Sequence, residues 1–179
     1  MAKPRIRPPR ATGFPPIAAA DARVLVLGSM PSLASLAREQ YYGHPRNAFW
    51  PIMGRLFGAG PELPYDERKR VLCRCGVAVW DVLKSCRRAG SLDTAIRVDS
   101  ETPNDFAAFF RTHPQIGVVY FNGQKAEMAF RRHVLRQLEG LGRELRYVRL
   151  PSTSPAHAGR SLEEKLAAWH AVRQSLNSL

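Results

Sequence analysis

No apolar run in this sequence is long enough to span a membrane. Its hydrophobic stretches fall well short of the ~20 residues that a transmembrane helix requires. The first ten residues, MAKPRIRPPR, are basic and proline-rich, whereas a secretory signal peptide carries an apolar core. We therefore expect a cytoplasmic protein with no membrane contact.

Cysteine is also scarce. The three cysteines, Cys73, Cys75 and Cys86, are odd in number and offer no second pair for a metal site. A disulfide framework and a structural zinc site are therefore disfavoured, and we expect free thiols and no bound metal.

Acidic residues are few relative to basic ones. The chain has 15 Asp and Glu against 27 Lys and Arg, a formal charge of +12. Such an excess favours a polyanionic partner, because cationic side chains neutralise phosphates and release counterions. A basic surface inherited from an arginine-rich proteome explains the same numbers, so charge alone indicates nucleic acid without establishing it.

The chain length of 179 residues fits one domain with a full core. Residues 1–12 form a basic arm rich in proline, which disfavours regular structure, and we expect this arm to be flexible. It either contacts DNA as a tail or is a plain solvated terminus. Residues 13–179 are then a single domain.

Wholly apolar runs alternate with helical patterns through this domain. Val24–Leu27, Val77–Trp80 and Ile116–Phe121 are typical of buried parallel strands, and 145–150 alternates like an edge strand. Apolar residues at helical spacing predict helices at 47–57, 65–75, 105–111, 125–139 and 161–176, the last opened by the capping box Ser161–Glu164. The polar stretch 84–103 is interpreted as a surface loop. This order predicts an α/β protein with a mostly parallel four-stranded sheet covered on both faces.

The loop after the first strand carries side chains that a packed core does not require. They are Tyr41, Tyr42, His44, Arg46 and Asn47. Ligands of open α/β sheets bind outside the carboxyl ends of the strands, where this loop lies. We interpret it as the active site.

Five segments, in matching order over roughly residues 13–176, resemble the uracil-DNA glycosylase superfamily. They are GSMPS, YYGHPRNAFW, RCGVAVWDVL, YFNGQKA and LPSTSPA. GSMPS, QYYGHPRNAFW and STSPA are most similar to the hypoxanthine-DNA (deoxyinosine) glycosylase branch, and HPRNAFW also resembles the mismatch-specific uracil-DNA glycosylases. The resemblance implies a three-layer α/β/α sandwich and hydrolysis of the N-glycosidic bond of a deaminated base, flipped out of the duplex.

Two positions depart from the superfamily pattern. Met30 stands where most uracil-DNA glycosylases have a water-positioning Asp, Asn or Glu, and Leu150 stands where many have His or Asn. The hypoxanthine branch shares both departures, and its resemblance implies that Asn47 is the catalytic residue. An amide does not titrate near neutrality, so Asn47 would orient water rather than act as a base. From spacing alone, Asn47 is equally a cap of the following helix.

The resemblance also implies a base-binding set: Gly28, Ser29, Met30, Pro31, Tyr42 and Asp81. Tyr42 matches the aromatic that stacks on the flipped base; otherwise it is a core aromatic. Asp81 stands where uracil-specific relatives place a base-reading Asn. A carboxylate there accepts from N1–H of hypoxanthine, although a helix or turn cap is the alternative. The backbone amides of Ser29 and Met30 are expected near the base O6 or uracil O2.

DNA contacts are expected from two further groups of residues. The candidate wedge, which enters a base step while its hydroxyls bind phosphates, is Ser152, Thr153, Ser154, Pro155 and Ala156; an ordinary strand-to-helix loop is the alternative. The candidate phosphate ligands are His44, which alternatively only orders its loop, Arg46, Lys125, Arg87, Arg88 and Arg160.

We expect no cofactor. The central motif has no lysine for Schiff-base chemistry, and a four-cysteine iron–sulfur pattern is missing. The expected partner is double-stranded DNA containing a deaminated base, bound by a monomer of bacterial type that is held at the nucleoid through DNA. Two other functions stay open: a mismatch-type uracil-DNA glycosylase, and a catalytically silent DNA-binding module of the same fold.

Overall fold

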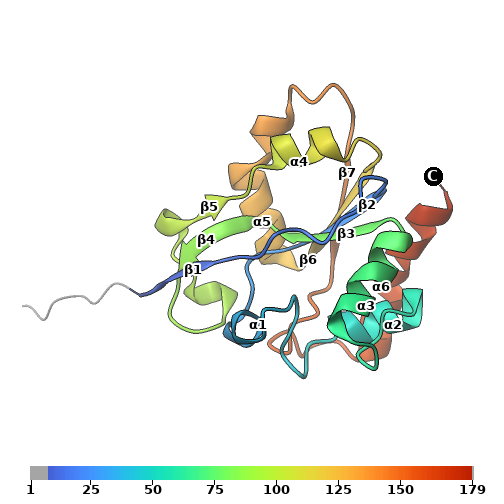
Figure 1. Cartoon of the computed structure of the whole chain (residues 1–179). Coiled ribbons are helices and arrows are strands. Elements are labelled where there is room, and N and C mark those ends of the chain that lie inside the picture. The colour runs from blue at the N-terminus through green and yellow to red at the C-terminus, as the bar shows by residue number, and fades with distance from the viewer. Residues whose placement is uncertain (1–7, 179) are drawn as a thin grey trace, which may run out of the picture.

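Four parallel strands form the central sheet, in the order β3-β2-β6-β7 (Figure 1). The computed structural model describes residues 8–178. The strands are β2 (Val24–Gly28), β3 (Val77–Asp81), β6 (Val118–Asn122) and β7 (Arg146–Leu150). Every residue of β2 and β3 is buried, which is why these runs are wholly apolar up to their last residues. The predicted mostly parallel four-stranded sheet is confirmed, with β7 at an edge.

Helices cover both faces of this sheet. They are α1 (Leu33–Arg38), α2 (Phe49–Phe57), α3 (Tyr65–Arg74), α4 (Phe106–Thr112), α5 (Gln124–His133) and α6 (Leu162–Asn177). Figure 1 shows α2, α3 and α6 on one side of the sheet and α4 and α5 on the other. The predicted sandwich of three layers is therefore confirmed. Its last helix begins with the predicted capping box at Ser161 and Glu164.

Two predicted helices differ at their ends. The helix expected at 47–57 begins at Phe49, and the one expected at 125–139 ends at His133. A short 3₁₀ helix, η3 (Leu135–Leu138), follows and keeps Leu138 buried. The apolar spacing therefore continued past the end of the α-helix, because 3₁₀ residues three apart also share a face.

The stretch 84–103 is not the surface loop that its composition predicts. It contains β4 (Leu83–Arg87), η1 (Asp93–Ala95), η2 (Val98–Ser100) and β5 (Thr102–Pro103). β4 is the middle strand of a second, antiparallel sheet with the order β1-β4-β5. Leu83, Ser85 and Cys86 are buried whereas Lys84 is exposed, so the polar residues of this stretch concealed a short strand.

Part of the predicted N-terminal arm is ordered against this second sheet. Residues 10–12 form β1 (Arg10–Thr12), which pairs antiparallel with β4, so a flexible arm reaching residue 12 is wrong at that end. The arm's residues 1–7 lie outside the described residues. After β1 the chain is held by reciprocal backbone hydrogen bonds between Ile17 and Val79, of 2.9 and 2.8 Å.

Within residues 8–178, no helix is both long and apolar enough to cross a bilayer. The three cysteines are free thiols, with Cys86 buried and the other two half-buried.

Candidate active site

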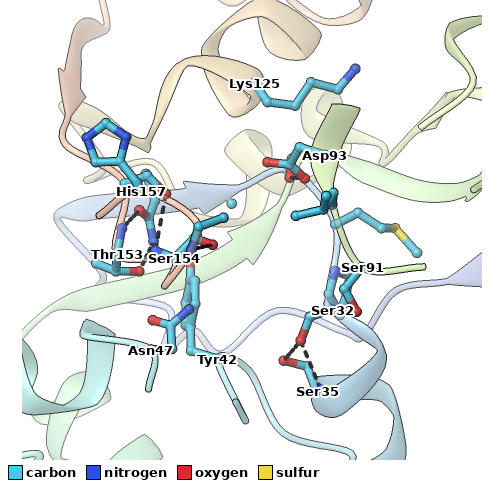
Figure 2. A pocket seen from close by; sticks show the side chains of 18 of the residues that line it. Ser32, Ser35, Tyr42, Asn47, Ser91, Asp93, Lys125, Thr153, Ser154 and His157 are labelled. Atoms are coloured by element: carbon cyan, nitrogen blue, oxygen red, sulfur yellow. Dashed lines mark hydrogen bonds between the residues drawn. The ribbon is translucent and has the colours of Figure 1, made fainter. Parts of the chain in front are cut away.

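A cavity of about 390 Å³ lies outside the carboxyl ends of the parallel strands (Figure 2). The strand ends Gly28, Asp81 and Asn122 all line it. Gly28 and Asp81 are adjacent across β2 and β3, and Asn122 ends the neighbouring strand β6. Further walls come from the loop after β2, the segment around η1, and the loop after β7. The sequence placed the site at this edge, and the cavity is where ligands of such sheets bind.

Gly28 is required at the floor of this cavity. A Cβ at this position would overlap the Asp81 carboxyl and lie 3.1 Å from the Tyr42 hydroxyl oxygen. The polar ends of Asp81 and Tyr42 therefore converge on the last residue of β2. Any larger side chain would fill the space between them.

Tyr42 forms one wall with an aromatic ring held in place from behind. Its ring stacks on Phe49, with centroids 3.9 Å apart and planes inclined by 22°. Its backbone has a φ of 54°, a left-handed conformation that costs a non-glycine residue on the order of 1–3 kcal/mol. The hydroxyl is buried without a hydrogen-bond partner, and burial raises its pKa, so it stays protonated. An unpartnered donor and a strained backbone are typical of a functional position.

Asn47 lines the cavity, and its amide also binds the first backbone N–H of α2, although the N-cap residue itself is Ala48. Its Oδ1 accepts from the Phe49 backbone N–H at 2.9 Å, which fixes the amide. Figure 2 shows the amide beside Tyr42 at the cavity. The second lone pair of Oδ1 and the Nδ2 donors are then available to hold a water or a ligand.

Asp81 is buried, and its Oδ2 has no hydrogen-bond partner. Burial, followed by the negative charge of Asp93, raises the pKa of Asp81 to about 8, against the opposing charge of Arg88. At neutral pH the Asp81 carboxyl is therefore mostly protonated. It can donate through O–H as well as accept, whereas the sequence suggested an acceptor only.

The loop after β7 is locked to the end of β6 by a pair of side-chain hydrogen bonds. Asn122 donates from Nδ2 to the Thr153 Oγ1 and accepts at Oδ1 from the Thr153 backbone N–H, both at 2.8 Å. The Thr153 carbonyl in turn accepts from Ala48 N–H at 3.0 Å, joining this loop to the one that carries Asn47. Thr153 is buried and its hydroxyl anchors the loop, while its expected contact with DNA stays a prediction.

The other members of the expected wedge are more accessible. Ser152 and Ser154 line the cavity, and their hydroxyl oxygens accept from the backbone N–H groups of Ser154 and Ala156, both at 3.2 Å. Each serine O–H is then left to donate outwards. Ala156 is exposed at the cavity rim, whereas Pro155 is half-buried and does not line it.

The expected phosphate ligands divide into accessible and enclosed side chains. Arg46 is exposed, and His44, outside the cavity, accepts at Nδ1 from the Arg46 backbone N–H at 3.1 Å. Lys125 lines the cavity but forms an ion pair with Glu101. Arg88 is not a surface ligand: it is buried and donates to the Pro31 carbonyl.

Arg87 and Arg160 lie apart from the cavity lining. Arg87 is half-buried and donates to the Pro8 carbonyl at 3.0 Å, so it braces the N-terminal segment. Arg160 is exposed just before α6.

Sequence reasoning missed the wall formed by residues 91–94. Asp93 accepts from the Ser29 hydroxyl at 2.6 Å, and Ser91 accepts at Oγ from the Leu33 N–H at 2.9 Å. The composition of this stretch indicated a loop, and nothing in it signalled that the loop folds back over the first strand's end. Asn122 was also missed, although its place after a buried strand was a usable signal.

Comparison with known proteins gives consistent matches. A family model described as the uracil DNA glycosylase superfamily matches residues 15–173. A hypoxanthine DNA glycosylase of Methanosarcina acetivorans is 33 % identical over 161 residues, covering 89 % of this chain and 96 % of that protein. A hypoxanthine DNA glycosylase of Methanosarcina barkeri is 37 % identical over 115 residues, covering 64 % and 72 %.

A solved structure agrees with these matches. The solution NMR structure of a candidate uracil DNA glycosylase from Methanosarcina acetivorans superposes with a TM-score of 0.77 at 32 % identity, covering 94 % of this chain and 99 % of the other. These relatives are archaeal, so they lend no support to the expectation of a bacterial-type protein.

Proposed function

The chain belongs to the uracil DNA glycosylase superfamily, and from this we propose that it is a hypoxanthine DNA glycosylase. It hydrolyses the bond between deoxyribose and N9 of hypoxanthine after the nucleotide leaves the base stack. Two hypoxanthine DNA glycosylases are 33 % and 37 % identical to it. The observation that carries the proposal at the residue level is that Asn47, Tyr42 and Asp81 line one cavity.

Asn47 positions the attacking water. Its amide is fixed by the hydrogen bond to Phe49 and borders the cavity, which supports orientation of water without proton abstraction. Met30 lines the same cavity and is nearly buried, and its thioether cannot orient water as a carboxylate or amide does. The attacking water therefore depends on Asn47.

Tyr42 and Asp81 bind the base. The Tyr42 ring supplies a stacking face, worth on the order of 1–3 kcal/mol per base. A neutral Asp81 carboxyl matches the N1–H and O6 edge of hypoxanthine, accepting from N1–H while its O–H donates to O6. The unpartnered Oδ2 supports this, because a base would satisfy it. Ser29 and Met30 line the same cavity, and their backbone amides are proposed to contact the base O6.

The loop 152–156 holds the DNA. Ser152 and Ser154 direct hydroxyls to phosphates flanking the lesion, and Ala156 enters the base step. Arg46 and His44 lie on the adjoining loop and contact the backbone. The proposed substrate is double-stranded DNA, on which the chain acts as a monomer.

Single-turnover excision tests this proposal. Wild type and Asn47→Ala are compared on duplexes that carry one deoxyinosine or one deoxyuridine, with duplex binding measured in parallel. We expect the wild type to release hypoxanthine and Asn47→Ala to lose release while retaining binding. Preferential uracil release would favour the mismatch-type function, and binding without release of either base would leave a silent DNA-binding module.

Asn104→Ala is the matched control for this experiment. Asn104 is also an amide whose side chain holds backbone, donating to the Asp81 carbonyl at 2.8 Å, but it does not line the cavity. Loss of the Asn104 amide should lower the stability of the protein without abolishing the release of hypoxanthine. Equal losses in both variants would indicate a folding effect and remove the support for Asn47 as the water-positioning residue.

A further inference from the structure

Leu92 is a large apolar side chain at the cavity, and none of the steps described so far uses it. It belongs to the wall formed by residues 91–94 and is among the residues that line the cavity. It is nevertheless 58 % exposed to solvent. A residue that both lines a cavity and meets solvent stands at its mouth, where a nucleotide leaving the duplex must pass.

The position of Leu92 sets it apart from other exposed apolar residues. Four more large apolar side chains are exposed in the part of the chain that the structure describes: Leu33, Val98, Met128 and Leu162. None of these four lines the cavity, and each is less exposed than Leu92. Single apolar residues scattered on a surface need no explanation. A leucine exposed at the mouth of the site does.

The backbone is fastened on both sides of Leu92. Before it, Ser91 accepts at Oγ from the Leu33 backbone N–H at 2.9 Å. After it, Asp93 accepts from the Ser29 hydroxyl at 2.6 Å. The two bonds tie this wall to the segment that follows β2. The leucine is therefore presented at the mouth by a fixed loop, which reduces the entropy lost when it contacts a partner.

The opposite wall offers no apolar side chain of this size. The loop 152–156 consists of Ser, Thr, Ser, Pro and Ala, and Ala156 is its exposed apolar residue. Figure 2 shows Ser91 and Asp93 across the cavity from Thr153. A base that rotates out of the duplex leaves a space in the stack, and a single methyl group is far too small to fill it. The side chains that proteins insert into base steps are Phe, Leu, Ile, Met and Pro.

We infer that Leu92 enters the DNA base stack and occupies the space that the flipped hypoxanthine nucleotide leaves. This rests on the proposed function. The leucine stabilises the opened duplex, in which the nucleotide lies in the cavity, and so raises the fraction of bound DNA that is ready for hydrolysis. It is a positioning residue, because no bond is formed or broken at its side chain. Ala156 approaches the same base step from the opposite wall.

Single-turnover excision at saturating protein tests this inference with two substrates. One is a duplex in which deoxyinosine faces cytosine, and the other is the same strand without its complement, which has no stacked pair to open. Leu92→Ala should lower the rate about 10–100-fold on the duplex, because unstacking is no longer offset, and less than ~3-fold on the single strand. Leu92→Met keeps a large apolar side chain and should restore the wild-type rate on the duplex.

Leu33→Ala is the matched control. It removes an exposed leucine from the segment to which Ser91 is bonded, and it keeps the backbone N–H that makes this bond. Because Leu33 does not line the cavity, the variant should match the wild type on both substrates. Thermal unfolding of the variants reports whether any loss of rate follows from folding.

Fluorescence of 2-aminopurine placed beside the lesion reports the opening without excision. Its emission rises when the neighbouring base leaves the stack. The lesion is 2′-fluoro-deoxyinosine, whose fluorine disfavours positive charge at C1′ and so prevents hydrolysis. Saturating wild type and Leu33→Ala should both raise the emission, whereas Leu92→Ala should leave it near that of the free duplex.

The outcomes separate this inference from the proposed function. Wild type that releases no hypoxanthine from the duplex contradicts the proposed function itself. Wild type that releases hypoxanthine, together with an unaffected Leu92→Ala, removes Leu92 from the opening of the duplex. Equal losses on the duplex and the single strand would place Leu92 against the base inside the cavity and overturn its insertion into the stack. An equal loss in Leu33→Ala would assign both leucines a structural role.

Discussion

Asp81 is a carboxyl group that the fold keeps out of water. It ends β3, is buried, and has one oxygen without a partner. Water would hydrate this carboxyl fully in the unfolded chain, so its burial destabilises the folded state. Positions of this kind persist at functional sites, where ligand rather than protein completes the hydrogen bonding.

We predict that Asp81→Asn changes how stability depends on pH. The pKa of Asp81 is about 8 in the folded protein and ~3.9 in an unfolded chain, so the folded state binds more protons between these values. The contribution of Asp81 to stability therefore becomes less favourable as the pH rises from about 4 to 8. The uncharged variant should gain on the order of a few kcal/mol relative to wild type between pH 5 and pH 9.

Urea unfolding at several pH values measures this change. Asp99→Asn serves as the control, since this exposed carboxyl should leave the shape of the wild-type curve unchanged. Parallel curves for wild type and Asp81→Asn would mean that Asp81 is ionised in the folded state already at pH 5, and the raised pKa would be wrong.

Site residues differ in how far the sequence could reveal them. Asn47, Tyr42 and Asp81 occupy motif positions, so the resemblance indicated all three, and Asp81 also ends a buried strand. Asp93 contacts Ser29 across 64 positions of sequence, in a segment without apolar periodicity. Arg88 was misassigned because an arginine near a glycine is typical of a surface, whereas here it is buried and donates to the Pro31 carbonyl.

At the scale of elements, the cavity depends on how its loops are fastened to strand ends. The loop after β7 has no regular structure, yet Asn122 at the end of β6 holds Thr153 through two hydrogen bonds. The Thr153 carbonyl accepts a hydrogen bond from the backbone N–H of Ala48, which precedes α2. The DNA-facing serines and the water-positioning Asn47 are therefore held by one set of bonds.

We predict that Asn122→Ala lowers excision more than Thr153→Val. The alanine variant loses both hydrogen bonds and leaves the buried Thr153 N–H and hydroxyl unpartnered, at about 1–3 kcal/mol each. The valine variant keeps the bond to the backbone N–H. Single-turnover excision of deoxyinosine at saturating enzyme should fall in that order, with duplex affinity falling in parallel. Equal rates in the two variants would show that the hydrogen bond from the Thr153 backbone N–H to Asn122 does not contribute to excision.

Elements were predicted where burial determines composition. Strands buried on both faces are continuous apolar runs, and α6 shows both its cap and its apolar stripe. The second sheet was missed because β4 is short, carries Lys84 and Arg87, and is stabilised by β1 and β5 far away in sequence. Such strands are specified by tertiary pairing rather than by local pattern.

For the whole molecule, the charge of +12 is the dominant electrostatic property. A charge of this size attracts DNA at long range, but only cations that reach phosphates release counterions. Arg46 is exposed on the loop between Tyr42 and α2. Lys125 lines the cavity but is paired with Glu101. The position of each cation should therefore decide how much it contributes to the affinity for DNA.

We predict that Arg46→Ala lowers the salt dependence of duplex binding by about one phosphate contact, a slope change of ~0.9 in log affinity against log salt. Lys125→Ala should change the slope less, because its ion pair with Glu101 competes with phosphate. Fluorescence anisotropy on a deoxyinosine duplex from low to moderate salt measures both. The control is Arg55→Ala, which removes the same charge beside Arg23, away from the cavity; Arg55 is paired with Glu163 as Lys125 is with Glu101, so it is matched to Lys125→Ala. If Arg55→Ala changed the slope as much as Arg46→Ala, binding would reflect net charge alone, and DNA would not be confined to the cavity edge of the sheet.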